Sequence, residues 1–481
     1  PGAARSDSPG PGRAGPPSAT GLAERLEHEV TERGGYRHLK ALQRLTDRYG
    51  GTRAAGTPGY AASARYVKKQ LTAAGYRVRY QRFSFPDFEP VTETARATGP
   101  ARRTLHPLMA QFSASTPKGG LRARLAVVPG PGCAAGEYAQ AAARGRIALV
   151  AGGSCSLARK QKTAHAAGAR AVLLNIGAPG ADANIRFFVV PREDARVPTA
   201  VLSRRESEQL TADAATGRPV ELDLTLRGRH MRTSSFNLLA DTPTGDPDRT
   251  VVLGAHLDGA REGPGINDNA TSAAMVLETA LRLAPHLDQV RHRVRFAWWG
   301  AEELIVQGSQ HYVDALTPAE LRGHALNLNF EMIGSPNFAR MVHDGDDSDG
   351  TGAGPGPPGS DTIERELAGH FARQGLPTAS RDLDGRSDYA PFMAAGVPVG
   401  GGMGGSNQLK TPRWQRLFGG AAGQWLDPCY HQVCDRIEHV DRALFGQFGK
   451  AMAHVTGRFA EDLAGIPDAA HRKGPAAAPG R

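Results

Sequence analysis

Residues 250–258 have the sequence TVVLGAHLD, and after a turn rich in Gly, Pro and Asn they are followed by TSAAMVLETALRLA at 271–284. The first segment is a short apolar run that ends in polar residues, and the second has the apolar spacing of a helix. Two further apolar runs follow, RVRFAWWGAEE at 293–303 and HALNLNFEMIG at 324–334. Apolar strands that alternate with helices predict an α/β domain with a mixed, mainly parallel sheet that is covered by helices on both faces.

The segments outside this core predict how the rest of the chain is organised. Amphipathic spacing between residues 22 and 75 predicts helices, and YRVRYQRFSF at 76–85 alternates as a half-buried strand does. Between about 96 and 226 the pattern changes to short strands and turns around one helical stretch, which predicts a compact insert. We therefore expect disordered tails at 1–21 and 466–481, an α/β domain built from 22–95 and 227–465, and an insert at 96–226.

Composition excludes two classes of partner. The formal net charge is +10, but the basic residues are scattered rather than massed with stacking aromatics, so we expect no nucleic-acid partner. No apolar run approaches the roughly 18 to 20 residues of a membrane span, so we expect a soluble chain with no membrane partner. The chain begins at Pro1 without a charged and then apolar leader, and we expect a trimmed mature form.

Acids and histidines occur where the predicted strands end. His256 and Asp258 close the first strand, and a carboxylate beside an imidazole can fix its tautomer for metal binding. Glu302 and Glu303 end the next strand, and Glu331 ends the third. Ligands collect beyond the carboxyl ends of strands in such sheets, so these side chains predict a site there.

The roles of these acids have alternatives. Asp268 precedes a helix, and its alternative role is an ordinary N-cap. Of the adjacent Glu302 and Glu303, one could bind a metal while the other handles a proton, or both could lie on a solvated loop. Histidines and carboxylates together suit one or two zinc ions and the hydrolysis of an acyl bond. The pattern alone does not distinguish an amide from a phosphate ester.

His431 lies inside CYHQVCD at 429–435. A bond between Cys429 and Cys434 would close a tight loop, contribute about 2 kcal/mol by loop entropy and hold the imidazole in place. Ligation of zinc by the cysteines is the alternative, although no second cysteine pair lies nearby. The other cysteines, Cys133 and Cys155, both lie in the insert. An even cysteine count divided between two domains predicts an oxidising compartment.

Six motifs occur in order: GAHLD, GPGINDNA, WGAEEL, NFEMIG, GRSDYAPF and DPCYHQVCD. With GGTRAAGTPGY at 50–60, they resemble the secreted bacterial leucine aminopeptidases of metallopeptidase family 28. The resemblance implies a zinc exopeptidase (phosphorylase/hydrolase-like) fold with two co-catalytic zinc ions per chain. It also implies a secreted aminopeptidase, which we expect to be a monomer. Its substrates would be peptides with a free N-terminus and an apolar first residue.

The resemblance also implies a set of metal ligands. His256 and Glu303 match terminal zinc ligands, Asp268 matches the carboxylate that bridges both metals, and His431 matches a ligand of the second zinc. Glu331 stands where the family usually has aspartate. Its extra methylene keeps the ligand type but moves the carboxylate, so it could change the chelation or weaken one zinc.

Four further residues match the family pattern. Glu302 would be the general base for a metal-bridged hydroxide, and Tyr430 would steady the oxyanion. Asp258 would orient His256, and Arg386 would help to hold the substrate. After Leu304 the family often has a glycine, where this chain has Ile305, so we expect the neighbouring loop to differ.

The insert resembles a protease-associated (PA) domain in GC, GRIALV and GSCSLARKQKTAHAAGARAVLLN. This resemblance implies a disulfide between Cys133 and Cys155. Such domains usually serve as lids or protein-contact modules, so we expect no catalytic role for the insert, and a passive spacer is the alternative. Two other functions stay open for the whole chain: a one-zinc acyltransferase of the glutaminyl-cyclase kind, and a non-catalytic binding protein.

Overall fold

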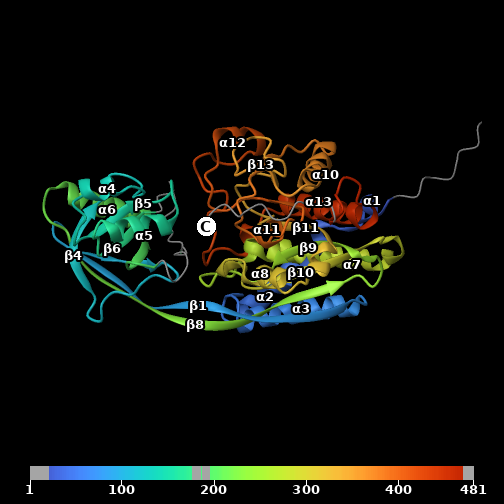
Figure 1. Cartoon of the computed structure of the whole chain (residues 1–481), viewed down its shortest axis with the longest axis horizontal. Helices are drawn as coiled ribbons and strands as arrows, with labels where there is room; N and C mark the ends of the chain where they lie inside the picture. The colour runs from blue at the N-terminus through green and yellow to red at the C-terminus, as the bar shows by residue number, and fades with distance from the viewer. Residues whose placement is uncertain (1–20, 176–185, 187–194, 470–481) are drawn as a thin grey trace, which may run out of the picture.

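The computed structural model describes residues 21–175, 186 and 195–469. Two lobes are joined by a long antiparallel strand pair, β1 (Arg77–Thr98) and β8 (Glu221–Asp241), which runs from one lobe into the other (Figure 1). The boundaries expected at 95/96 and 226/227 fall inside these two strands, so the lobes share the hairpin. Residues 1–20 and 470–481, which make up most of the two expected tails, lie outside the described residues, whereas Ile466 is buried in the core.

The larger lobe contains the sheet predicted from the apolar runs. Its neighbouring strands follow the order β13-β12-β14-β11-β9-β10-β8. The pairs β14 with β11, β11 with β9, and β9 with β10 are parallel, while β8 and β12 run antiparallel to their neighbours β10 and β14. The bounds are β9 (Asp246–His256), β10 (His292–Trp299), β11 (His324–Glu331), β12 (Met341–His343), β13 (Ala379–Arg381) and β14 (Val399–Met403). The prediction of a mixed, mainly parallel sheet is confirmed.

Helices cover both faces of this sheet. The main apolar core includes residues of α1 (Leu22–Glu29), α2 (Glu32–Arg48), α3 (Pro58–Ala73), α7 (Thr271–Leu283), α10 (Ser360–Arg373) and α13 (Arg442–Glu461). A second core joins the sheet to α8 (Gln307–Asp314) and α11 (Ala390–Ala394). The short helices α9 (Pro318–Arg322) and α12 (Pro412–Phe418) complete the lobe. Among the described residues, no helix combines the length and apolar character that a membrane crossing needs.

The smaller lobe is the predicted insert. Its strands β4 (Leu121–Val127), β5 (Ile147–Ala151), β6 (Ala171–Asn175) and β7 (Thr199–Leu202) pair in parallel, and β4 joins β8. Around them lie β2 (Arg103–Leu105), β3 (Leu108–Met109), α4 (Ala135–Gln140), α5 (Leu157–Ala166) and α6 (Arg204–Ala215). The Cys133–Cys155 disulfide is present with an S–S distance of 2.05 Å, which confirms that prediction.

Candidate metal centre and active site

The predicted site residues meet at one edge of the sheet. β9 ends at His256 and β11 ends at Glu331, and these parallel strands are direct neighbours. Glu302 and Glu303 lie in a short turn after β10, the neighbour of β9 on its other side. Because the carboxyl ends of parallel strands point the same way, the three strands deliver their polar side chains to a common place.

Asp268 joins two clusters of metal-ligating side chains. In the first, His256 Nε2 lies 3.3 Å from Asp268 Oδ1 and 3.9 Å from Glu331 Oε1. In the second, His431 Nε2 lies 3.3 Å from Asp268 Oδ2 and 2.9 Å from Glu303 Oε2. The two oxygens of Asp268 therefore face different histidines, which is the arrangement that a bridging carboxylate needs. The longer Glu331 side chain still reaches the first cluster.

The donor atoms of these clusters fit zinc. Among the described residues, no hydrogen-bond partner satisfies the buried atoms His256 Nε2, Asp268 Oδ1, Glu303 Oε1 and His431 Nε2. Imidazole nitrogens and carboxylate oxygens are ligands that Zn²⁺ prefers, and buried polar atoms are otherwise rarely left unpaired. Burial and then the neighbouring Asp268 raise the pKa of Glu303 to about 7. A divalent cation would offset this repulsion between carboxylates.

Asp258 contributes through both its backbone and its side chain. His256 Nδ1 lies 3.1 Å from the backbone carbonyl oxygen of Asp258 and 3.7 Å from the carboxylate Oδ1. The Asp258 carboxylate accepts hydrogen bonds from the backbone amides of Glu302 and Glu303, at 3.2 and 3.4 Å. β9 ends at His256, so Asp258 lies beyond the strand, and its carboxylate mainly fixes the turn that carries the paired glutamates.

The turn that carries Glu302 has unusual backbone conformations. Glu302 is only 8% exposed, and its Oε2 lies 3.7 Å from His256 Nε2. Burial raises the pKa of Glu302 well above its ordinary value, and the Glu331 carboxylate adds to this. Around it, Ala301, Ile305 and Val306 have φ values of 58°, 70° and 47°. Left-handed conformations cost about 1 to 3 kcal/mol each for such residues, and they cluster where a side chain must be aimed.

The cysteine bracket holds the second histidine. The Cys429–Cys434 disulfide is present with an S–S distance of 2.15 Å, which confirms that prediction. The ring of Tyr430 stacks on His431 with centroids 3.9 Å apart. Burial, with nearby Asp268, raises the pKa of Tyr430 well above its ordinary value, so its hydroxyl keeps its proton at neutral pH. A protonated hydroxyl at this place can donate a hydrogen bond.

Sequence reasoning missed two residues that hold the loop around Asp268. Asp435, the last residue of the cysteine bracket, accepts hydrogen bonds from the amides of Asn267 and Asp268 at 2.7 and 3.1 Å. Asn269 Nδ2 donates to the carbonyl of Phe330, next to Glu331 on β11, at 3.0 Å. The only sequence signal for them was their position inside the motifs.

Arg386 lies at the exposed side of the site. Its backbone amide donates to Asp384 at 3.1 Å. Tyr430, followed by carboxylates that include Glu331, raises the pKa of Arg386 above its ordinary value. The guanidinium is therefore a permanent positive charge within electrostatic range of the two clusters.

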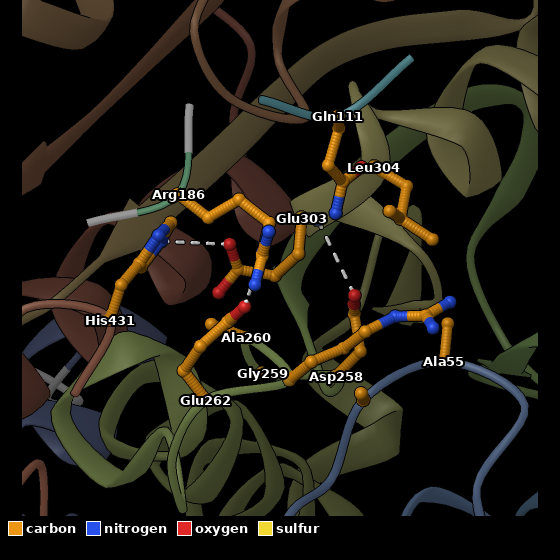
Figure 2. Close-up of a pocket in the computed structure, with 12 residues that line it drawn as sticks. Ala55, Gln111, Arg186, Asp258, Gly259, Ala260, Glu262, Glu303, Leu304 and His431 are labelled. Atoms are coloured by element: carbon orange, nitrogen blue, oxygen red, sulfur yellow. Dashed lines mark hydrogen bonds and ion pairs between the residues drawn. The ribbon is translucent and has the colours of Figure 1, made fainter. Parts of the chain in front are cut away.

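The insert contributes to a small pocket beside the second cluster. Figure 2 shows His431 joined to Glu303, the Arg186 side chain of the insert reaching Glu262, and Gln111, also of the insert, beside Leu304. Arg186 Nε donates to Glu262 Oε1 at 2.7 Å, which ties the insert to the loop that follows β9. Nothing in the sequence signalled these two residues, because the contact depends on how the lobes are placed.

Comparison with known proteins agrees with this arrangement. A profile of peptidase family M28 matches residues 237–456, and a PA domain profile matches 121–210. The chain is 35% identical over 459 residues to a probable lipoprotein aminopeptidase of Mycobacterium tuberculosis, covering 93% of this chain and 89% of that protein. It is 37% identical over 436 residues to an aminopeptidase of Pseudomonas aeruginosa, covering 87% of this chain and 79% of that protein.

A solved structure is also similar. A zinc aminopeptidase from Bacillus subtilis matches with a TM-score of 0.65 and 25% identity, covering 91% of this chain and 99% of that one. The similarity to the two aminopeptidase relatives spans most of each chain, and the family profile includes every residue of both clusters. The chain therefore belongs to peptidase family M28 and carries a PA domain as its insert.

Proposed function

We propose that this chain is a zinc-dependent aminopeptidase that holds two zinc ions. His256, Asp268 and Glu331 would bind one ion, and Asp268, Glu303 and His431 would bind the other. The observation that carries the proposal is Asp268, whose two oxygens face the two histidines at 3.3 Å each. The orphaned donor atoms of both clusters and the aminopeptidase relatives support the same conclusion.

The protein residues around the clusters suit peptide hydrolysis. When bound, the two zinc ions would polarise the scissile carbonyl and acidify the attacking water. Glu302 acts as general base: its carboxylate takes a proton from the water and delivers it to the leaving amine. Tyr430 donates its hydroxyl proton in a hydrogen bond to the carbonyl oxygen as negative charge develops there.

An aminopeptidase must also recognise a free N-terminus. The carboxylates of Glu302 and Glu331 both lie near His256 Nε2, at 3.7 and 3.9 Å. They are placed to attract the α-ammonium group, while Arg386 holds the peptide backbone. We expect an apolar first residue to be preferred.

We place the protein outside the cytoplasm, as a secreted monomer. Its two disulfides are stable in oxidising compartments, and one relative is named a lipoprotein aminopeptidase. Size-exclusion chromatography with light scattering would test the monomer, and fractionation of the natural host would test secretion.

The test combines metal content with substrate choice. We expect elemental analysis to find two zinc ions per chain, and hydrolysis of leucyl-p-nitroanilide to disappear and return as zinc is removed and restored. N-acetyl-leucyl-p-nitroanilide is the matched control, and it should not be cleaved. Equal cleavage of the blocked substrate would refute exopeptidase action. One zinc per chain with cyclisation of N-terminal glutamine would instead establish the glutaminyl-cyclase reaction.

A further inference from the structure

Arg53 is a fully buried cation that the mechanism above does not use. It belongs to the segment GGTRAAGTPGY between α2 and α3, and 0% of its surface is exposed. Its guanidinium donates to three main-chain carbonyls: Nε to Leu257 at 3.2 Å, Nη1 to Pro264 at 2.5 Å and Nη2 to Gly265 at 2.6 Å. All three of these hydrogen bonds go to backbone carbonyl oxygens, so the buried charge stabilises the backbone conformation of the segment that carries them.

The three carbonyls lie at the two ends of one loop. Leu257 follows the cluster residue His256, and Pro264 and Gly265 come shortly before Asp268. Arg53 therefore ties the start of the loop to its end. The preceding residue supports the same contact, because Thr52 Oγ1 donates to the carbonyl of Ala260, in the middle of the loop, at 3.1 Å. A guanidinium of fixed shape thus links the backbone next to His256 with the backbone shortly before Asp268.

A buried carboxyl group, that of Asp435, holds the other side of the loop. Asp435 accepts from the amides of Asn267 and Asp268, whereas Arg53 donates to the carbonyls just before them. Burial lowers the pKa of Arg53 to about 10, and nearby Asp435 counteracts this. Arg53 therefore keeps its charge at neutral pH. The loop that bears Asp268 is therefore held on its carbonyls by the Arg53 guanidinium and on its amides by the Asp435 carboxyl group.

We propose that Arg53 is a positioning residue of the metal centre, which orients His256 and Asp268 for the ion they share. This inference rests on the proposed function, because it assumes that both residues bind zinc. Changes in residues that orient metal ligands typically weaken metal affinity by about 10- to 100-fold. We expect an effect of this size when Arg53 loses its three hydrogen bonds.

The test compares Arg53→Met and Arg53→Lys with Arg340→Met. Arg340 is also buried and donates to a backbone carbonyl, that of Pro377 at 2.8 Å, but it belongs to neither cluster. We would measure zinc affinity by competition with a chelator, and record the visible absorption of the cobalt-substituted protein, which reports ligand geometry. Arg53→Met should bind zinc about 10- to 100-fold more weakly and change the cobalt spectrum. Arg53→Lys should recover part of the zinc affinity and part of the wild-type cobalt spectrum. Arg340→Met should lower only the melting temperature.

Three outcomes would overturn the inference. Arg53→Met could keep wild-type affinity and spectrum while its melting temperature falls, which would make Arg53 a purely structural residue. It could bind zinc more tightly, which would mean that charge rather than position matters. If Arg53→Met does not fold, Arg53→Lys decides, and wild-type affinity and spectrum in that variant refute the inference. A wild-type protein that binds zinc but cleaves no leucyl substrate refutes the proposed activity instead, and leaves these binding results interpretable.

Discussion

Among the described residues, two parts of the molecule bring histidines and carboxylates within metal-ligand distance, and they differ in what else touches them. The first is the metal centre around Asp268. The second, which we name the helical cluster, consists of Glu27, His370 and His454 on α1, α10 and α13. In both parts the ligand atoms of a cluster lie within 4.8 Å of one another. Distance alone therefore does not separate a metal site from a structural contact.

Hydrogen bonding does separate them. In the helical cluster, His454 Nδ1 lies 2.9 Å from Glu27 Oε2, and its Nε2 lies 3.1 Å from Arg373 Nη2. Arginine can only donate, so His454 Nε2 must accept, and its proton sits on Nδ1, which donates to Glu27. His454 Nδ1, the nitrogen that faces Glu27, is therefore protonated and is not available to bind a metal. In the metal centre, His256 Nε2 and His431 Nε2 face carboxylate oxygens at 3.3 and 2.9 Å, but no described residue meets hydrogen-bond geometry with either nitrogen.

The largest expected difference between the two parts is catalytic. Glu302→Gln should lower kcat by about 10²- to 10⁴-fold, because the amide cannot act as general base. Zinc content should not change. Glu27→Gln is the matched control in the helical cluster and should keep wild-type kcat on leucyl-p-nitroanilide. Wild-type kcat in Glu302→Gln would contradict the role of Glu302.

Metal content gives the next test of the comparison. His431→Ala removes a donor from the second cluster, so we expect zinc per chain to fall from two to one. His454→Ala changes a histidine of similar burial in the helical cluster and should leave two zinc ions per chain. Elemental analysis of both variants after dialysis measures this. A loss of zinc from His454→Ala would show that hydrogen-bond satisfaction does not distinguish the two parts.

A smaller effect should follow from opening the Cys429–Cys434 disulfide. His431 depends on this short loop, and a bond that spans 5 residues of sequence restricts the unfolded chain by about 2 kcal/mol. Changing both cysteines to serine frees the loop that carries His431, and the affinity of the second cluster for zinc should therefore fall by about tenfold. The paired control, serine at Cys133 and Cys155, should reduce the stability of the insert and leave zinc affinity unchanged. Chelator titration with thermal unfolding distinguishes these outcomes.

The smallest effect concerns pH and the helical cluster. Burial, followed by the neighbouring His454, lowers the pKa of His370 from 6.5 to about 3. In the unfolded chain this imidazole takes up a proton as the pH falls below 6.5, but in the folded protein it does not. The free energy of unfolding should therefore decrease between pH 7 and pH 5, and His370→Gln should show a shallower decrease. Urea titrations at several pH values measure how steeply the free energy of unfolding changes with pH in the wild type and in His370→Gln. Equal slopes would contradict a lowered pKa of His370.

Much of the fold was predictable because its signals are local. The apolar runs that end at His256 and Glu331 predicted strands of a mainly parallel sheet, and the polar residues at their ends predicted a metal site. The resemblance to known peptidases added residue roles and the Cys133–Cys155 bond. Arg53 and Arg186 were not predicted, since an arginine in a loop has no chemical signature until its partners are known.

The sequence by itself determined the order of strands and helices, the kinds of ligand available and the short loop around His431. These follow from hydrophobic period, side-chain chemistry and small sequence separations. Only the tertiary structure decided that Glu303 faces His431 while Glu331 faces His256. It also decided that an arginine from the N-terminal segment grips the loop before Asp268. Such contacts depend on which strands are neighbours and where each backbone turns, and no local pattern encodes them.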